Sequence, residues 1–236
     1  MTAMQIPIEW LPAQGQPQQL IVLLHGWAQD STMFLPLAQA LRAQFAQAAI
    51  LAPDAPHAAD DGRRGRQWYS IQGIAEKAIW RARVQAGVAL IEPWVRAQQQ
   101  RLGVPPAATA LGGFSQGGLL ALHTALQFDG IAGRVLAFGA RMVDLPAQPP
   151  RETTLHLFHG SADRIFDVAH VRELLDHLSQ QRGDATLDVA EGLGHDLHPA
   201  LIDCALHRLT HHIPLRTWQA ALGAVPAGPL AARDDR

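Results

Sequence analysis

The chain has 236 residues, of which 48% are hydrophobic and 17% are charged, and its formal net charge at pH 7 is −2. This length suits one α/β domain with a full-sized core, and the composition is typical of a globular protein. Binding to nucleic acid requires clustered Lys and Arg, so the weak net charge argues against a nucleic-acid partner.

Cysteine content and the first residues bear on the cellular compartment. Cys204 is the only cysteine, which excludes an internal disulfide and a Cys-based metal cluster. The segment Met1–Leu20 has no basic stretch, and the first apolar run, Leu20–Leu24, is too short for a signal sequence or a membrane span. We therefore expect no stable membrane insertion and, by default, a cytoplasmic protein.

Short apolar runs alternate with longer segments that have apolar residues at three- and four-residue spacing. The runs, predicted as strands, are Gln19–His25, Ala49–Ala52, Ala108–Phe114, Arg134–Phe138, Thr154–His159 and Thr186–Ala190. The predicted helices are Met33–Gln44, Ile74–Leu102, Gly117–Gln127, Val168–Gln181 and Pro199–His212. Several runs are apolar throughout, as in strands buried on both faces. The alternation predicts an α/β fold with a mostly parallel central sheet and helices on both faces.

Three features interrupt this alternation. Pro93 lies inside the predicted helix Ile74–Leu102 and should kink it or divide it. Residues 56–73 form a polar segment too long for an ordinary connection, which suggests a functional loop or a lid. Residues 223–236 have the composition of a disordered tail. We therefore predict a single domain over residues 1–222.

The clearest motif is G-x-S-x-G at Gly113, Ser115 and Gly117. A predicted strand precedes it and a predicted helix follows it, which is the context of a nucleophile elbow. In that turn the serine is strained, and the flanking positions must lack side chains. A phosphate-binding glycine loop is the alternative, but the Lys of a P-loop is missing. Ser115 is therefore the candidate nucleophile.

A nucleophilic serine needs a general base, and the base needs an orienting carboxylate. In this fold they follow in the order Ser, Asp or Glu, His. Asp163 comes just after one buried strand, and His195 follows the last strand and a glycine-containing turn. His198 is the second choice for the base. Asp167 is the alternative acid, although its position favours capping the next helix.

Two segments are candidates for contact with the substrate. The turn His25-Gly26-Trp27 follows the first buried strand, where this fold places one amide of the oxyanion hole. We assign the two amides to Trp27 and Gln116, with His25 and Gly26 beside the substrate; a plain strand-ending turn is the alternative. Trp68, in the long loop, is a candidate wall of the acyl pocket or an anchor of that loop.

These motifs resemble the carboxylesterase/phospholipase family of α/β-hydrolases. The resemblance rests on Gly113–Gly118, Leu24–Gly26 and His159–Asp163, and it extends from about Leu20 to about Pro214. Within the family, Gly65–Gly73 and Asp188–His195 are most similar to bacterial YpfH-type esterases. The family also includes acyl-protein thioesterases.

Carried over by position, the resemblance implies the triad Ser115, Asp163 and His195, with oxyanion amides at Trp27 and Gln116. One segment departs from the family: where it has His-Gly-x-Gly-Asp, this chain has Ala28 in place of the second glycine. Because Trp27 is bulky, we expect small or medium acyl groups.

The sequence therefore predicts a serine hydrolase that cleaves small-molecule carboxylic esters, with thioesters left open and without a metal or organic cofactor. An acyl-protein thioesterase or lysophospholipase for long chains is one alternative. A non-catalytic binding protein on the same scaffold is another. A dienelactone-hydrolase-like enzyme would need a cysteine at the elbow, and Cys204 lies in a late helix. A homodimer is also left open.

Overall fold

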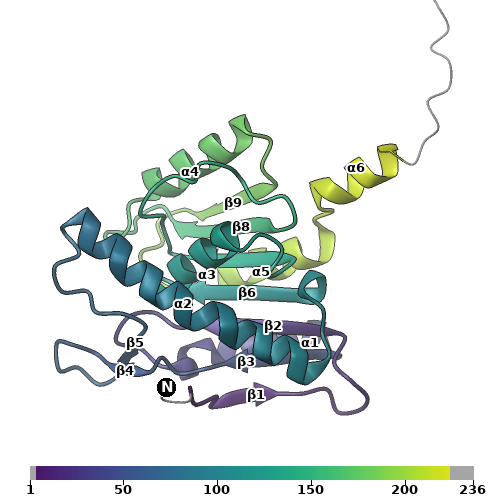
Figure 1. Ribbon diagram of the computed structural model, residues 1–236, viewed down its shortest axis with the longest axis horizontal. Helices are drawn as coiled ribbons and strands as arrows, with labels where there is room; N and C mark the ends of the chain where they lie inside the picture. Colours follow the sequence, from purple (N-terminus) through teal and green to yellow (C-terminus); the bar gives the residue numbers. More distant parts are fainter. Residues whose placement is uncertain (1–3, 224–236) are drawn as a thin grey trace, which may run out of the picture.

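A computed structural model of the protein, describing residues 4–223, has a seven-stranded sheet at its centre (Figure 1). The strand order is β1-β3-β2-β6-β7-β8-β9; β1 is antiparallel to β3 and all other neighbours are parallel. The strands are β1 (Ile8–Trp10), β2 (Gln19–Leu24), β3 (Ala48–Ala52), β6 (Thr109–Phe114), β7 (Arg134–Phe138), β8 (Thr154–Gly160) and β9 (Ala185–Ala190). The predicted α/β class with a mostly parallel sheet is confirmed.

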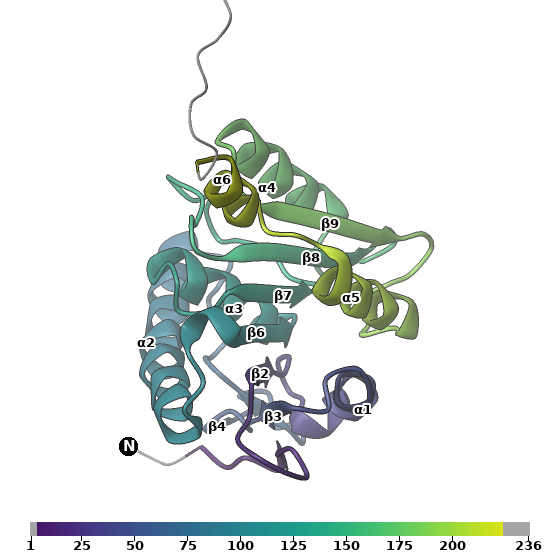
Figure 2. The ribbon, with the colours of Figure 1, turned by 90° about the vertical axis from the view of Figure 1, so that its right-hand side faces the viewer.

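Helices cover both faces of the sheet (Figure 2). They are α1 (Leu35–Gln44), α2 (Lys77–Leu102), α3 (Gln116–Gln127), α4 (Val168–Gln180), α5 (Pro199–His211) and α6 (Leu215–Gly223), with short 3-10 turns at Ser31–Phe34 and Pro106–Ala108. Helices α2, α3 and α4 bury apolar residues against one face, and α1 and α5 do so against the other. The sheet thus separates two apolar cores, which is why several of its strands are apolar along their whole length.

Pro93 does not divide the long helix, so that part of the prediction is wrong. Helix α2 continues through it from Lys77 to Leu102. The ring of Pro93 lies on the exposed side, whereas Val88, Ile91 and Val95 are buried against the sheet. Proline removes one backbone hydrogen bond, but packing of the apolar face supplies most of the stability of a helix in a protein.

The order of the strands reverses beside β2. From β2 the chain crosses to β3 on one side, and β6 then pairs with β2 on the other side. In open parallel sheets, ligands bind at such a switch point, outside the carboxyl ends of the strands. The two segments that leave this point are the turn His25-Gly26-Trp27 after β2 and Ser115 after β6.

Segments outside the main sheet differ in how they are held. Within residues 56–73, β4 (His57–Ala58) pairs with β5 (Arg66–Gln67); motion of this loop as a lid stays a prediction. Helix α6 extends beyond the sheet (Figure 1), and the rest of the expected tail, residues 224–236, lies outside the described residues.

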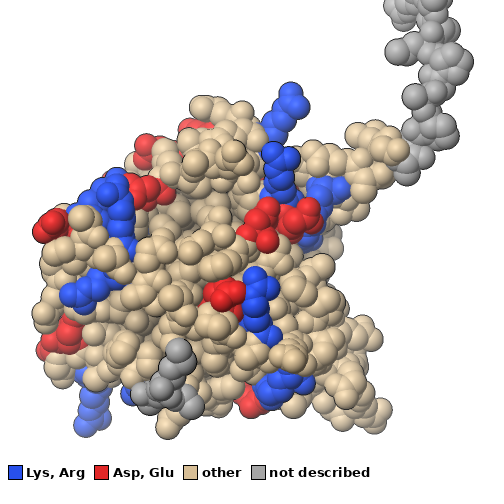
Figure 3. Space-filling view, viewed as in Figure 1, with Lys and Arg blue, Asp and Glu red and all other residues tan. Residues whose placement is uncertain are grey.

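None of the described helices is long and apolar enough to span a bilayer. Charged side chains of both signs are scattered over the face in Figure 3.

Candidate active site

Ser115 occupies a strained turn between β6 and α3. Its backbone has φ 52° and ψ −114°, a region that residues with side chains rarely adopt. A Cβ on Gly117 would overlap the carbonyl oxygen of Leu24, and a Cβ on Gly113 would overlap the backbone of Gly117. The two glycines of the motif are therefore required by close backbone contacts, and the turn has the geometry of a nucleophile elbow.

Ser115, His195 and Asp163 form a continuous chain of hydrogen bonds. His195 Nε2 lies 2.9 Å from Ser115 Oγ, and His195 Nδ1 lies 2.7 Å from Asp163 Oδ2. The Asp163 side chain is fully buried, whereas 17% of the His195 side chain is exposed. The three residues predicted from separate motifs are thus brought together, with the hydroxyl and the carboxylate on opposite nitrogens of one imidazole.

The surroundings of the imidazole and the carboxylate restrict their orientation. Asp163 Oδ1 accepts hydrogen bonds from the backbone N–H groups of Ile165, at 2.8 Å, and Phe166, at 2.9 Å. The ring of His195 packs against Phe114, with centroids 4.8 Å apart. A Cβ on Gly139 would lie 3.3 Å from the imidazole. Backbone donors therefore hold the carboxylate, and Phe114 and Gly139 hold the ring.

A second histidine, which sequence reasoning did not assign, contacts the same carboxylate. His159 is fully buried, and its Nε2–H donates to the carbonyl of Phe166 at 2.7 Å and lies 3.3 Å from Asp163 Oδ2. Burial lowers the pKa of His159, which favours the neutral imidazole. The sequence signal that could have indicated this contact is the position of His159, four residues before Asp163.

The alternative acid and base have other partners. Asp167 accepts a hydrogen bond from the N–H of Ala169 at 2.8 Å and so caps α4. His198 accepts from the N–H of Ala200 at 3.2 Å and caps α5. Both side chains therefore accept hydrogen bonds from backbone N–H groups in the first turn of a helix.

The turn after β2 is fixed by a buried histidine. The Nδ1–H of His25 donates to the carbonyl of Gly26 at 2.7 Å, and Nε2 accepts from the N–H of Ala55 at 2.9 Å. Burial lowers the pKa of His25, so the neutral ring ties the turn to the segment after β3. Contact of His25 or Gly26 with a substrate stays a prediction, and the His25 side chain is fully buried.

Two backbone amides, one in the turn after β2 and one directly after Ser115, have no acceptor in the described part of the protein. Among the described residues, neither the N–H of Trp27 nor that of Gln116 donates a hydrogen bond within the protein. Gln116 is the first residue of α3, where the N-terminal end of the helix favours negative charge. These are the two amides that the sequence assigned to an oxyanion hole.

The side chain of Gln116 joins the elbow to the long loop. Gln116 Oε1 accepts from the N–H of Trp68, and Gln116 Nε2 donates to the carbonyl of Tyr69, both at 2.8 Å. The indole N–H of Trp68 donates to the carbonyl of His25 at 2.8 Å, and Trp68 is only 2% exposed. Trp68 therefore anchors the loop, and its contact with an acyl group stays a prediction.

Ala28, which stands where the family pattern has glycine, has a strained backbone conformation. Ala28 has φ 55°, in the left-handed region that favours glycine. Its carbonyl is approached so closely by Gly65 that a Cβ at residue 65 would overlap it. The neighbouring Trp27 is tied to the same loop, since its indole N–H donates to Gln67 Oε1 at 2.8 Å. The turn is thus held in place by the long loop.

Replacing Ala28 with glycine should stabilise the protein. We expect the free energy of unfolding of Ala28→Gly to rise by about 0.5–1 kcal/mol, because relief of left-handed strain outweighs the added freedom of the unfolded chain. Urea unfolding measures the change. As a control, Ala97→Gly on the exposed face of α2 should lose about 1 kcal/mol. A loss of stability in Ala28→Gly would contradict the prediction.

The described part of the chain has no cluster of side chains placed to bind a metal ion. Over residues 4–223, no group of three or more His, Cys, Asp or Glu side chains is placed to hold a metal ion. The polar groups around Ser115 are instead a hydroxyl, two imidazoles, one carboxylate and backbone amides. This set fits acyl transfer to an oxygen nucleophile.

Fold and site together define a class of protein. A mostly parallel sheet carries a strained serine after a central strand, and an acid and a histidine follow in loops after later strands. This arrangement is that of the α/β-hydrolases.

Comparison with known proteins specifies the family. The model of the phospholipase/carboxylesterase family matches residues 10–213. Esterase YpfH of Escherichia coli (strain K12) is 35% identical over 211 residues, covering 89% of this chain and 90% of the relative. Acyl-protein thioesterase 1 of Eremothecium gossypii is 25% identical, covering 83% and 89%. The crystal structure of esterase PE8 superposes with a TM-score of 0.79 at 25% identity, covering 89% and 99%. The chain belongs to the phospholipase/carboxylesterase family.

Proposed function

We propose that the protein is a serine esterase that hydrolyses carboxylic esters of small or medium acyl groups. The observation that carries this proposal is the hydrogen-bonded chain from Ser115 Oγ through His195 to Asp163, with distances of 2.9 and 2.7 Å. Family membership and the esterases among its relatives support the same reaction class.

In the first step, the hydroxyl of Ser115 attacks the ester carbonyl while His195 Nε2 takes its proton. Asp163 holds Nδ1–H, which fixes the tautomer that accepts this proton and stabilises the imidazolium that forms. The backbone amides of Trp27 and Gln116 donate to the oxyanion, helped by the N-terminal end of α3. The alcohol leaves with the proton from His195.

In the second step, water repeats the sequence on the acyl-enzyme. His195 takes a proton from the water as it attacks the acyl carbonyl, and Ser115 recovers its proton when the carboxylic acid leaves. Each step uses groups of this chain, and no metal or organic cofactor takes part in the proposed reaction.

Substrate preference is tested with a series of acyl chains. We expect kcat/KM for p-nitrophenyl acetate and butanoate to exceed that for the hexadecanoate by about tenfold or more, because we expect the bulky Trp27 side chain to narrow the acyl site. Trp27→Ala retains the backbone amide and should reduce this difference. Equal or faster turnover of the hexadecanoate by the natural protein would favour the long-chain lysophospholipase alternative.

The same series made with thiol esters tests the thioesterase alternative, which the acyl-protein thioesterases among the relatives favour. A thiol is a better leaving group than an alcohol, so butanoyl thioester should also be cleaved. A preference for hexadecanoyl thioesters over every oxygen ester would make the protein a thioesterase. Absence of turnover for every ester would favour a non-catalytic binding protein.

A further inference from the structure

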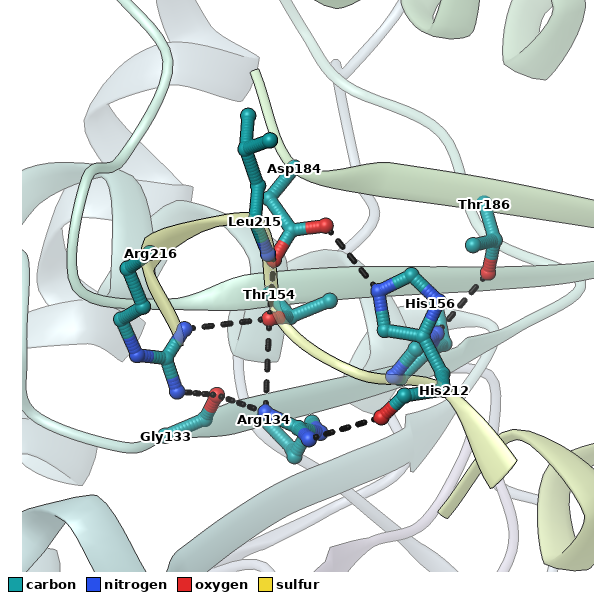
Figure 4. Close-up of polar contacts among 9 residues, drawn as sticks. All are labelled: Gly133, Arg134, Thr154, His156, Asp184, Thr186, His212, Leu215 and Arg216. Atoms are coloured by element: carbon teal, nitrogen blue, oxygen red, sulfur yellow. Dashed lines mark hydrogen bonds and ion pairs between the residues drawn. The ribbon is translucent and has the colours of Figure 1, made fainter. Parts of the chain in front are cut away.

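A cluster of polar residues lies at the opposite end of the sheet from Ser115, where β7, β8 and β9 begin (Figure 4). Two arginines dominate it: Arg134, the first residue of β7, and Arg216, in the first turn of α6. Given a rise of about 3.3 Å per residue, the length of β6 separates this end from the elbow by roughly 20 Å. The cluster therefore has no direct contact with the proposed reaction.

The two guanidinium groups share the same neutral acceptors. The carbonyl of Gly133 accepts from both, at 3.3 Å each. The hydroxyl oxygen of Thr154 lies 3.4 Å from a nitrogen of Arg134 and 3.1 Å from one of Arg216. Because they converge on the same oxygens (Figure 4), the two cations are close neighbours. Burial, and then the charge of Arg216, lowers the pKa of Arg134.

The charges of this cluster do not cancel. Among residues 4–223, no carboxylate lies within ion-pair distance of Arg134 or Arg216. The nearby acid, Asp184, accepts instead from Thr154 Oγ1 at 2.6 Å, the N–H of Leu215 at 3.0 Å and His212 at 3.0 Å.

Two other charged or titratable groups near the cluster leave its charge unchanged. Arg208 is paired with Asp188, so this pair adds no net charge. Burial lowers the pKa of His156 to about 3, so that ring is neutral. Two guanidinium groups thus face one carboxylate, and the described cluster is positive.

Both arginines also line a cavity of about 330 Å³, at the lower end of the range of small-molecule sites. Much of the remaining lining is apolar and includes Ile21, Phe45, Leu209 and Pro214. A cavity lined both by two neighbouring guanidinium groups and by apolar side chains is complementary to an anion with a short hydrocarbon chain. Guanidinium groups bind carboxylates with strong, oriented hydrogen bonds.

We propose that this cavity is a second binding site, remote from Ser115, for a small carboxylate with a short apolar chain. Arg134 and Arg216 hold the carboxylate, and the wall formed by Phe45 and Leu209 receives the chain. Binding would relieve the repulsion between the two cations. Arg134 also donates to the carbonyl of His212, the C-cap of α5, at 3.3 Å, so Arg216 is the arginine to change in a test.

The probe is hexanoate, titrated into the full-length protein and followed by the backbone amide NMR signals. We expect saturable shifts at Gly133, Thr154 and Arg216. Arg216→Gln should weaken binding about tenfold or more, the loss expected when a charged hydrogen bond is removed. Ala108→Leu, which adds bulk to the apolar lining of the cavity, should abolish the shifts. Arg172→Gln, on the exposed face of α4, is the matched control and should bind as the natural protein does.

The outcomes separate this site from the proposed active site. All three variants should keep their esterase activity, and because the readout is binding at Gly133 and Thr154, it does not depend on that activity. Shifts confined to residues around Ser115 would overturn the proposal. So would equal affinity for hexanamide, which carries no charge, or for inorganic phosphate, which has no apolar chain. Undiminished binding by Arg216→Gln and Ala108→Leu would overturn it as well.

Discussion

Replacing Ser115 with alanine should lower kcat for p-nitrophenyl butanoate by about four orders of magnitude or more, because the change removes the nucleophile. His195 and Asp163 would remain, but without the hydroxyl no acyl-enzyme forms. The oxyanion amides and substrate binding would leave only a small residual rate. Steady-state kinetics of the purified variant measure the loss.

The fold of this variant should be retained. Alanine meets the same backbone strain at φ 52° as serine, so circular dichroism and the midpoint of thermal unfolding should change little. Ser179→Ala, on the exposed side of α4, is the matched control and should keep full activity. A folded Ser115→Ala variant with more than about a tenth of the natural kcat would exclude Ser115 as nucleophile.

Replacing Asp163 with asparagine should lower kcat by about 10⁴-fold. The N–H groups of Ile165 and Phe166 both point at Oδ1, so the amide oxygen should take that place and the NH₂ group should face His195. A donor there requires His195 Nδ1 to accept, which puts the imidazole proton on Nε2. That nitrogen could no longer take the proton of Ser115.

Asp167→Asn is the matched control, because asparagine also caps helices well and Asp167 is outside the triad. Its kcat should stay within about twofold of the natural value. Equal kcat values for Asp163→Asn and the natural protein would show that Asp163 does not orient the base.

The motif residues could be predicted because their constraints are local. Buried strands appear as short apolar runs, and a serine between Gly113 and Gly117 indicates an elbow because larger residues would overlap neighbouring backbone. The acid and the base follow later strands, and in a parallel sheet the carboxyl ends of the strands meet at one edge. The six predicted strands are confirmed, each to within one residue at either end.

Other features depend on contacts between distant segments, for which the sequence has no local signal. Strand β1 has only three residues, too few for a pattern, and its place is set by pairing with β3. The strain at Ala28 arises where the turn after β2 meets the long loop. Arg134 and Arg216 are not part of any motif in the sequence. Their side chains lie close together because the chain after α5 returns to the start of β7.

Labelling with a fluorophosphonate tests most directly whether Ser115 is an activated nucleophile, since such probes react with a serine whose proton a neighbouring base removes. The native protein should take up one probe group per chain, located by peptide mass spectrometry on Ser115, and heat-unfolded protein should take up none. No labelling of the native protein, or labelling at a residue other than Ser115, would contradict the proposed mechanism.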